Sequence, residues 1–203
     1  MRELQAYIRK EGQVLSEQVL KVNSFLNHQV DPNLVMDIGK TIAERYKDAG
    51  ITKIVTIEAS GIHIAFAAAL SLGVPFLYAK KSKAITQSNE VYAASVYSFT
   101  RQQTYQITIS KEFLASGDKV LIVDDILAEG AGVRGLGEII QAAGCELVGV
   151  SVVIEKVFRT AERCWMMLEY RSMHSPASLR CRQRKASSSS QKSPSRGICS
   201  RVK

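Results

Sequence analysis

The chain has 203 residues, of which 46% are apolar and 23% charged, an ordinary balance for a protein with a buried core. That length fits one α/β domain with a small appendage. The sequence holds no apolar run near the ~20 residues of a membrane span, and residues 1–5 show no signal-peptide pattern. Composition therefore argues against global disorder, export and membrane insertion.

The cysteines indicate a reducing compartment. None of the four is spaced as Cys-x-x-Cys, so a disulfide framework or a zinc site is not expected. We therefore expect a cytoplasmic protein. The four residues are Cys145, Cys164, Cys181 and Cys199.

The net charge of +8 is concentrated at one end of the chain. Residues 1–156 hold 16 Lys and Arg against 17 Asp and Glu, a net charge of −1. Residues 157–203 hold 11 against 2, a net charge of +9. Since the globular part is nearly neutral, the basic excess says nothing about its partners.

The predicted elements alternate between strands and helices. Residues 2–22 begin with helical spacing of Leu4, Ile8 and Leu15, and Asp31-Pro32 predicts the start of a helix that runs to about residue 48. Because the later strands and helices follow one another at βαβ spacing, we expect an α/β fold with a mostly parallel central sheet. The later elements are a strand over 54–57, a helix over 62–72, a strand over 74–79, two antiparallel strands over 91–99 and 104–109, a strand over 119–125, a helix over 132–143 and a strand over 146–154.

The most specific stretch is residues 120–132, a hydrophobic strand that runs into Asp124 and Asp125, then a loop of small residues and a helix. Ligands of open α/β sheets bind beyond the carboxyl ends of the strands. Backbone N–H groups at the start of the helix suit a phosphate, and the two carboxylates suit sugar hydroxyls or Mg²⁺. The same residues also fit an ordinary turn with two solvated acids.

This stretch resembles the phosphoribosyl-pyrophosphate (PRPP) motif of type I phosphoribosyltransferases. The similarity to the bacterial xanthine-using members of that family continues at unshifted spacing through residues 1–158. It implies the type I phosphoribosyltransferase fold, with a central sheet flanked by helices and a small hood from residues 1–32. It also implies a flexible loop over 80–111 that closes over the site. The segments that carry the similarity are 12–32, 52–62, 94–100 and 153–156.

The resemblance assigns a PRPP site. It implies that backbone amides of the loop after Asp125 cradle the 5-phosphate and that Asp124 and Asp125, the catalytic pair, hold the ribose hydroxyls. It implies a pyrophosphate loop after the strand over 54–57, although that loop alone also fits a helix cap by Ser60. The assigned residues are Ala128, Glu129, Gly130, Ala131 and Gly132 for the phosphate, and Glu58, Ala59, Ser60 and Gly61 for the pyrophosphate.

Three further residues are implied to bind the purine. Lys156 donates to an exocyclic oxygen, Asn27 hydrogen-bonds a second oxygen, and Leu20 packs on the ring. Alone, Lys156 also fits a strand-end lysine in water, and His28 and His63 are given structural roles. The implied reaction is purine salvage in a homodimeric enzyme: xanthine displaces pyrophosphate from PRPP to give xanthosine 5′-monophosphate (XMP), with Mg²⁺ on the pyrophosphate.

Glu129 departs from the family pattern, and residues 80–111 have a second interpretation. Glu129 stands where the family commonly has Asn, and an acid at ~5 Å from a phosphate repels it unless its side chain points away, so we expect weakened PRPP binding. Residues 80–111, taken alone, also fit a solvated basic hairpin with Lys80, Lys81 and Lys83 on the surface.

The resemblance stops after Phe158. Residues 159–203 hold ten serines and no hydrophobic period, which fits a disordered tail or a basic tail for RNA or a membrane surface. A frameshift near codon 159 fits better, because Cys164-Trp165-Met166-Met167-Leu168 can encode Leu-Asp-Asp-Ala in a shifted frame. Resequencing the gene tests this hypothesis, and a nucleic-acid partner is not expected.

The residues leave two other functions open. One is a transcriptional regulator of the same fold that senses PRPP or a purine. The other is a phosphoribosyltransferase that prefers guanine or hypoxanthine.

Overall fold

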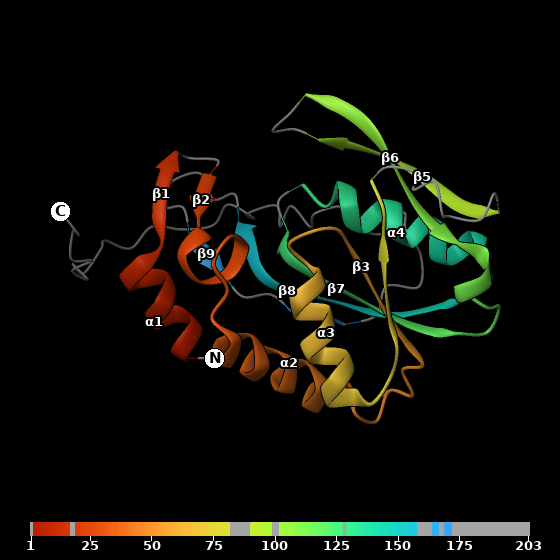
Figure 1. Ribbon diagram of the computed structural model, residues 1–203, viewed down its shortest axis with the longest axis horizontal. Helices are drawn as coiled ribbons and strands as arrows, with labels where there is room; N and C mark the ends of the chain where they lie inside the picture. The colour runs from red at the N-terminus through yellow and green to blue at the C-terminus, as the bar shows by residue number, and fades with distance from the viewer. Residues whose placement is uncertain are drawn as a thin grey trace, which may run out of the picture.

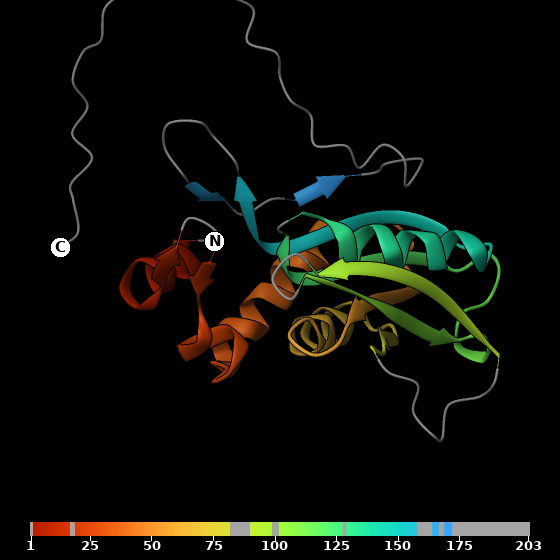
Figure 2. The same ribbon diagram turned by 90° about the horizontal axis from the view of Figure 1, so that it is seen from above.

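The computed structural model describes residues 2–16, 19–81, 90–98, 102–127, 129–157, 164–166 and 169–171 (Figures 1 and 2). Its elements follow one another in the expected alternation. In chain order they are α1 (Arg2–Glu11), β1 (Gln13–Ser16), β2 (Val19–Lys21), the π-helical turn η1 (Asn23–Asn27), α2 (Pro32–Tyr46), β3 (Lys53–Ile57), α3 (Ile62–Leu72), β4 (Phe76–Ala79), β5 (Val91–Ser98), β6 (Gln103–Ser110), the 3₁₀ turn η2 (Lys111–Phe113), β7 (Lys119–Leu127), α4 (Ala131–Ala142), β8 (Glu146–Val157), β9 (Cys164–Met166) and β10 (Glu169–Arg171).

The central sheet confirms the predicted α/β class. Its strands lie in the order β10-β8-β7-β3-β4, with β9 also paired to β8. Strands β4, β3, β7 and β8 run parallel, whereas β9 and β10 are antiparallel to β8. Since parallel strands end at the same edge, the segments after β3, β4, β7 and β8 meet there.

Helices cover both faces of this sheet. Neighbouring residues on a strand point to opposite faces, so Leu121 packs with α2 and α3 while Ile122 packs with α4. Figures 1 and 2 show α2 and α3 side by side, and the β5–β6 hairpin lying along α4. The described strands and helices thus enclose two apolar clusters, one on each face of the sheet.

The N-terminal segment differs from its prediction. Helix α1 ends at Glu11, and β1 and β2 form an antiparallel hairpin where the helical spacing up to Leu15 was expected to continue. The reason is that Gly12 follows the helix and local pairing of the two short strands replaces further helical turns. The cap at Asp31 is as predicted: its Oδ1 accepts the N–H groups of Asn33 and Leu34 at 2.9 and 3.2 Å, and its Oδ2 accepts the Tyr7 hydroxyl at 2.7 Å.

The hairpin within residues 80–111 belongs to the core. Strands β5 and β6 pair antiparallel as predicted, and Ala94, Val96 and Ile107 are buried against α4. The alternative of a solvated hairpin is therefore wrong for this inner face. Residues 82–89 and 99–101 of the expected flexible loop lie outside the described residues.

Part of the C-terminal segment has regular structure. Within 159–203, where no order was expected, β9 and β10 pair with β8, and the rest lies outside the described residues. Backbone pairing needs no hydrophobic period, which is why these strands could not be predicted from the sequence pattern. Among the described helices, none has the length and hydrophobicity to cross a membrane.

Candidate functional site

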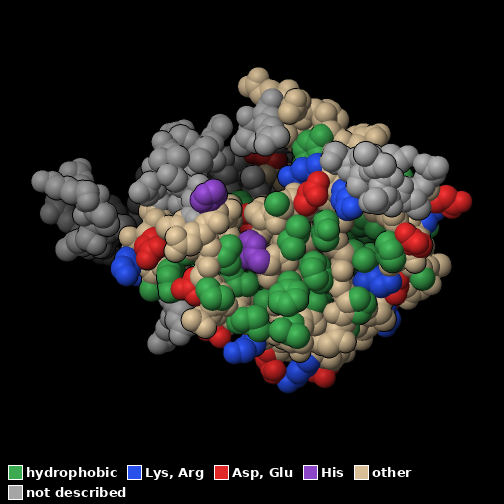
Figure 3. Space-filling view, viewed as in Figure 1, with side chains coloured by type: hydrophobic (Ala, Val, Ile, Leu, Met, Phe, Trp, Pro, Cys, Tyr) green, Lys and Arg blue, Asp and Glu red, His purple; other side chains and the backbone are tan. Residues whose placement is uncertain are grey.

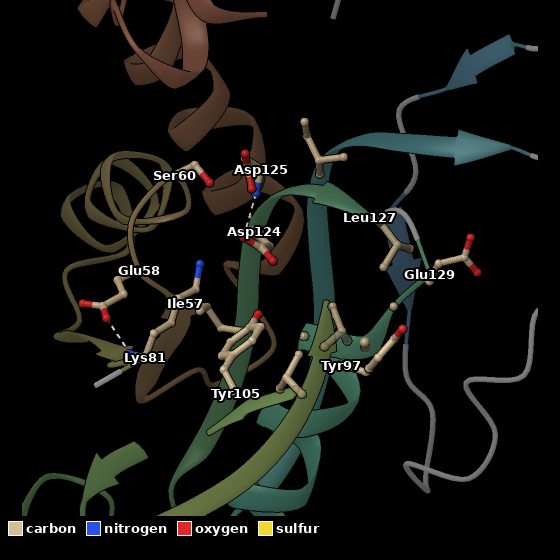
Figure 4. Close-up of a pocket in the computed structure, with 16 residues that line it drawn as sticks. Ile57, Glu58, Ser60, Lys81, Tyr97, Tyr105, Asp124, Asp125, Leu127 and Glu129 are labelled. Carbon is tan, nitrogen blue, oxygen red and sulfur yellow. Dashed lines mark hydrogen bonds between the residues drawn. The ribbon is translucent and has the colours of Figure 1, made fainter. Parts of the chain in front are cut away.

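A pocket of about 280 Å³ lies where β3 and β7 end and α4 begins (Figure 4). It brings together most of the residues that the sequence assigned to PRPP. Ala59 and Gly61 do not line it, although their neighbours do, and Ala128 lies outside the described residues. The assigned residues that line it are Glu58, Ser60, Asp124, Asp125, Glu129, Gly130, Ala131 and Gly132.

The two acids lie in the last residues of β7 rather than beyond it, because the strand continues to Leu127. Asp125 is 7% exposed, and its N–H donates to Asp124 Oδ1 at 3.0 Å. Burial, together with the negative charge of Asp125, raises the pKa of Asp124 well above its ordinary value. The arrangement holds two acceptor carboxyl groups at the wall of the pocket.

The loop over residues 58–61 is a tight turn between β3 and α3. Its Glu58–Ala59 peptide bond is cis. Glu58 Oε1 accepts the Lys81 backbone N–H at 2.5 Å, which ties this loop to the end of β4. Ser60 does not cap α3, because the helix begins after Gly61 and has no side-chain cap; of the alternative interpretation, the cap by Ser60 is therefore wrong.

Gly61 lies where no side chain fits. Its φ of −75° is open to any residue, so its backbone conformation does not require glycine. A Cβ atom at Gly61 would lie 2.0 Å from Thr56 Oγ1 and 2.8 Å from Asp124 Oδ1. The glycine therefore permits the 58–61 loop to rest directly on Asp124.

The loop before α4 can hold an anion. Gly130 has φ 71° and provides no side-chain cap, so the first N–H groups of α4 have no capping partner from it. Arg134 of α4 donates from its Nη1 to the Glu129 carbonyl at 2.9 Å, which ties the loop to the helix. The N–H groups at a helix start and the helix dipole together favour a phosphate here.

Glu129 is exposed, and its side chain extends away from Asp124 and Asp125 (Figure 4). This orientation lessens the repulsion that the sequence predicted, because water screens the carboxylate from an anion in the pocket.

Of the three residues predicted to bind the purine, the structure describes the side chain of one. Asn27 is exposed at the end of η1, outside the pocket lining, and the side chains of Leu20 in β2 and Lys156 in β8 lie outside the described parts. The Leu26 carbonyl hydrogen-bonds His63, which puts η1 against the start of α3. The segment with Asn27 thus lies next to the 58–61 loop.

His63 fits its structural role. Its Nε2 is buried without a hydrogen-bond partner, and burial lowers the pKa of the imidazole, although Asp125 and the Leu26 carbonyl oppose the shift. His28 is exposed on the turn after η1.

Among the pocket residues that the sequence did not assign, three carry a polar or charged group: Lys81, Tyr97 and Tyr105. Lys81 lies two residues after β4, at the carboxyl edge of the sheet, and this position was a signal that could have marked it as a candidate. The two tyrosines come from the β5–β6 hairpin, and no motif marks them. Figure 4 shows Tyr105 beside Lys81 at the pocket wall.

Comparison with known sequences identifies relatives. Residues 27–174 match the phosphoribosyl transferase domain family. The chain is 59% identical over 159 residues to a xanthine phosphoribosyltransferase of Brevibacillus brevis, covering 78% of this chain and 81% of that one. It is 54% identical over 159 residues to a xanthine phosphoribosyltransferase of Streptococcus agalactiae, covering 78% and 82%. The matched length is close to the 158 residues over which the sequence carries the resemblance.

Solved structures confirm the fold. An adenine phosphoribosyltransferase of Saccharomyces cerevisiae superposes with a TM-score of 0.59 at 25% identity, covering 74% of this chain and 89% of that one. An adenine phosphoribosyltransferase of Rhodothermus marinus gives a TM-score of 0.63 at 23% identity, covering 77% and 88%. These similarities establish the type I phosphoribosyltransferase fold predicted from the sequence.

Proposed function

We propose that this chain, which belongs to the phosphoribosyltransferase family, transfers the 5-phosphoribosyl group of PRPP to xanthine, giving XMP and pyrophosphate in purine salvage. The relatives named as xanthine phosphoribosyltransferases support the choice of purine. The observation that carries the proposal is the pocket itself, where the loop that opens α4 and the 58–61 loop with Lys81 flank a pair of carboxyl groups.

Each part of PRPP has a complementary wall. The backbone N–H groups at the start of α4 bind the 5-phosphate, and Asp124 and Asp125 accept hydrogen bonds from the ribose hydroxyls. The 58–61 loop and the ammonium group of Lys81 bind the pyrophosphate at the opposite wall. This arrangement holds the anomeric carbon between them, with the leaving group directed at a cation.

The purine binds on the side of the hood. In this proposal Asn27 and Lys156 donate to the two exocyclic oxygens of xanthine, and Leu20 packs on its ring. The nucleophile needs no general base, because xanthine is acidic enough to lose a proton in water. The positions of η1 beside α3 and of β8 beside β7 support a base site at this edge.

Mg²⁺ fits the donors of the pocket. No cluster of three or more metal-ligating side chains occurs among the described residues, and Asp124 with Asp125 offers oxygen ligands only. Such a site suits Mg²⁺, which binds one or two carboxylates and substrate phosphates. When bound, the ion offsets the negative charge that develops on the departing pyrophosphate.

The test is a purine panel. The full chain is mixed with PRPP, Mg²⁺ and, separately, xanthine, guanine, hypoxanthine and adenine, and nucleotide formation is followed by chromatography. XMP formed faster than the other nucleotides supports the proposal. PRPP binding without any turnover would instead indicate a regulator of the same fold, and faster formation of GMP or IMP would reassign the purine.

Glu129→Gln is expected to strengthen PRPP binding slightly. Removing an exposed negative charge near the phosphate loop lowers the KM for PRPP about twofold to threefold at low ionic strength, with no effect at ~0.5 M salt, where screening is complete. Steady-state kinetics at both salt concentrations measure this. Glu138→Gln, an exposed change on the same helix, serves as the control, and an equal response of both variants contradicts a local effect.

We also propose a cytoplasmic homodimer formed through the α3 face. Figure 3 shows hydrophobic side chains gathered over α3 on this face of the molecule. Phe66, Leu70 and Tyr78 are 51%, 60% and 41% exposed, and the Phe66 ring meets Phe76 edge-on at 6.1 Å. An apolar face of this kind is typical of an interface between copies of a chain.

Leu70→Glu is therefore expected to yield monomers. In a self-complementary interface this charge would meet a copy of itself and could not be paired. The dissociation constant of the dimer should therefore rise at least ~100-fold. Sedimentation velocity of the wild type and the variant measures it. Phe113→Glu, a change at a side chain that is 53% exposed outside this face, should remain dimeric; a monomeric wild type refutes the interface.

A further inference from the structure

The ring of Tyr105 lies beneath the ammonium group of Lys81 in the pocket. Lys81 Nζ stands 5.5 Å from the centre of the Tyr105 ring, within the range of an attractive cation–π contact. Both residues line the pocket, and Figure 4 shows them next to one another beside Ile57. The cation and the ring come from different elements, the end of β4 and the strand β6.

Lys81 is an exposed residue on a flexible stem, so something must direct its head into the pocket. Its backbone is fixed by the Glu58 carboxylate at 2.5 Å. Its charge also reaches Asp124, whose pKa it lowers against the larger effects of burial and Asp125. The hydrogen bond to Glu58 fixes the backbone of Lys81, and the ring of Tyr105 contacts the ammonium group at the end of its side chain.

Tyr105 is itself held in place. It pairs opposite Val96 in the β5–β6 ladder, and it packs against the apolar cluster that also contains α4. The rigid ring restricts the Lys81 side chain before an anion binds. The conformational entropy that Lys81 loses on binding is therefore smaller.

We propose that Tyr105 is a positioning residue, whose aromatic face holds the Lys81 ammonium toward the pyrophosphate end of the pocket. This inference rests on the proposed function, because PRPP supplies the anion. The ring, rather than the hydroxyl, carries the effect.

The hairpin contains its own control. Lys111 Nζ lies 5.7 Å from the ring of Tyr92, which packs against the same cluster, but neither residue lines the pocket. Loss of the Tyr92 ring therefore removes a contact of the same kind from the same hairpin without touching the site.

The experiment compares KM for PRPP, KM for xanthine and kcat in five variants of the full chain: Tyr105→Phe, Tyr105→Leu, Tyr92→Leu, Lys81→Met, and Lys81→Met combined with Tyr105→Leu. Tyr105→Phe should stay within about twofold of wild type, whereas Tyr105→Leu should raise the KM for PRPP about threefold to tenfold and leave the KM for xanthine unchanged. Tyr92→Leu should leave both KM values unchanged. In a Lys81→Met background, Tyr105→Leu should add no further change, since the partner is gone.

Phenylalanines with increasing fluorination at position 105 keep the packing while weakening the ring's negative face. The KM for PRPP should rise with the number of fluorine atoms, and this series decides the matter if Tyr105→Leu does not fold. The inference is overturned if Tyr105→Phe is as impaired as Tyr105→Leu, if the effects of Lys81→Met and Tyr105→Leu add independently, or if fluorination has no effect. A wild-type protein without turnover overturns the proposed function instead, which separates the two failures.

Discussion

Asp124→Asn is expected to lower kcat/KM about 100- to 1000-fold while making the folded protein more stable. In the proposed function Asp124 accepts hydrogen bonds from the ribose hydroxyls, and the activity falls because these bonds weaken when the carboxylate becomes an amide; a hydrogen bond to a charged group contributes about 1.5–3 kcal/mol. The folded state becomes more stable because a desolvated carboxylate beside Asp125 is replaced by a neutral amide. Asn retains the oxygen that accepts the Asp125 N–H, so the backbone contact survives.

The stability gain depends on pH with a definite sign. Because the pKa of Asp124 is raised above the ordinary value of 3.8, the folded state binds this proton more tightly than the unfolded state. Ionisation therefore costs stability as pH rises above 3.8 toward the folded pKa. At neutral pH the variant should therefore be more stable than the wild type, and the difference should shrink as pH falls toward 3.8.

Urea unfolding between pH 4 and 8 measures this difference, and Asp118→Asn provides a control of opposite sign. Burial alone raises the pKa of Asp118, but hydrogen bonds from Lys53, Ala115 and Thr52 at 2.8–2.9 Å lower it overall. Its carboxylate stabilises the fold above the unfolded pKa, and this is lost as pH falls through the folded pKa. Asp118→Asn should therefore destabilise an active enzyme, and equal signs for the two variants would contradict this account.

Gly61→Ala is expected to lower kcat/KM at least ~100-fold and to reduce the free energy of unfolding by about 1–3 kcal/mol. The new methyl group would lie 2.0 Å from Thr56 Oγ1 and 2.8 Å from Asp124 Oδ1, so the 58–61 loop or the carboxyl group must move. Either movement changes the spacing between the loop proposed to bind pyrophosphate and the acid proposed to bind ribose. Enzyme kinetics and urea unfolding follow the two effects.

A second change at Thr56 tests the cause. Thr56 is fully buried and its hydroxyl has no hydrogen-bond partner, so its removal costs little. Thr56→Ala with Gly61→Ala removes the nearer clash and should recover part of the stability and activity. Thr56→Val with Gly61→Ala keeps an atom in the same place and should recover neither. Wild-type behaviour of Gly61→Ala alone would show that the close approach does not matter.

The hydrophobic spacing and cap residues were enough to predict most elements of the fold. Asp31-Pro32 marked the start of α2, and the alternation of strands and helices predicted the parallel sheet, because these signals act between residues near in sequence. The N-terminal hairpin was missed, since its short strands carry too few residues for a period to be recognised. The strands β9 and β10 were missed because they depend on pairing with β8.

For the site, the sequence by itself determined the chemistry offered along one strand and loop: Asp124 and Asp125 at the end of β7, followed by the loop that opens α4. Only the tertiary structure decided what these residues meet. It placed Gly61 against Asp124, brought Lys81 over the ring of Tyr105, and partly buried Asp124 at the wall of the pocket. The physical reason is that contacts between strands distant in the chain, and the desolvation they cause, follow from packing and leave no periodic or spacing signal in the sequence.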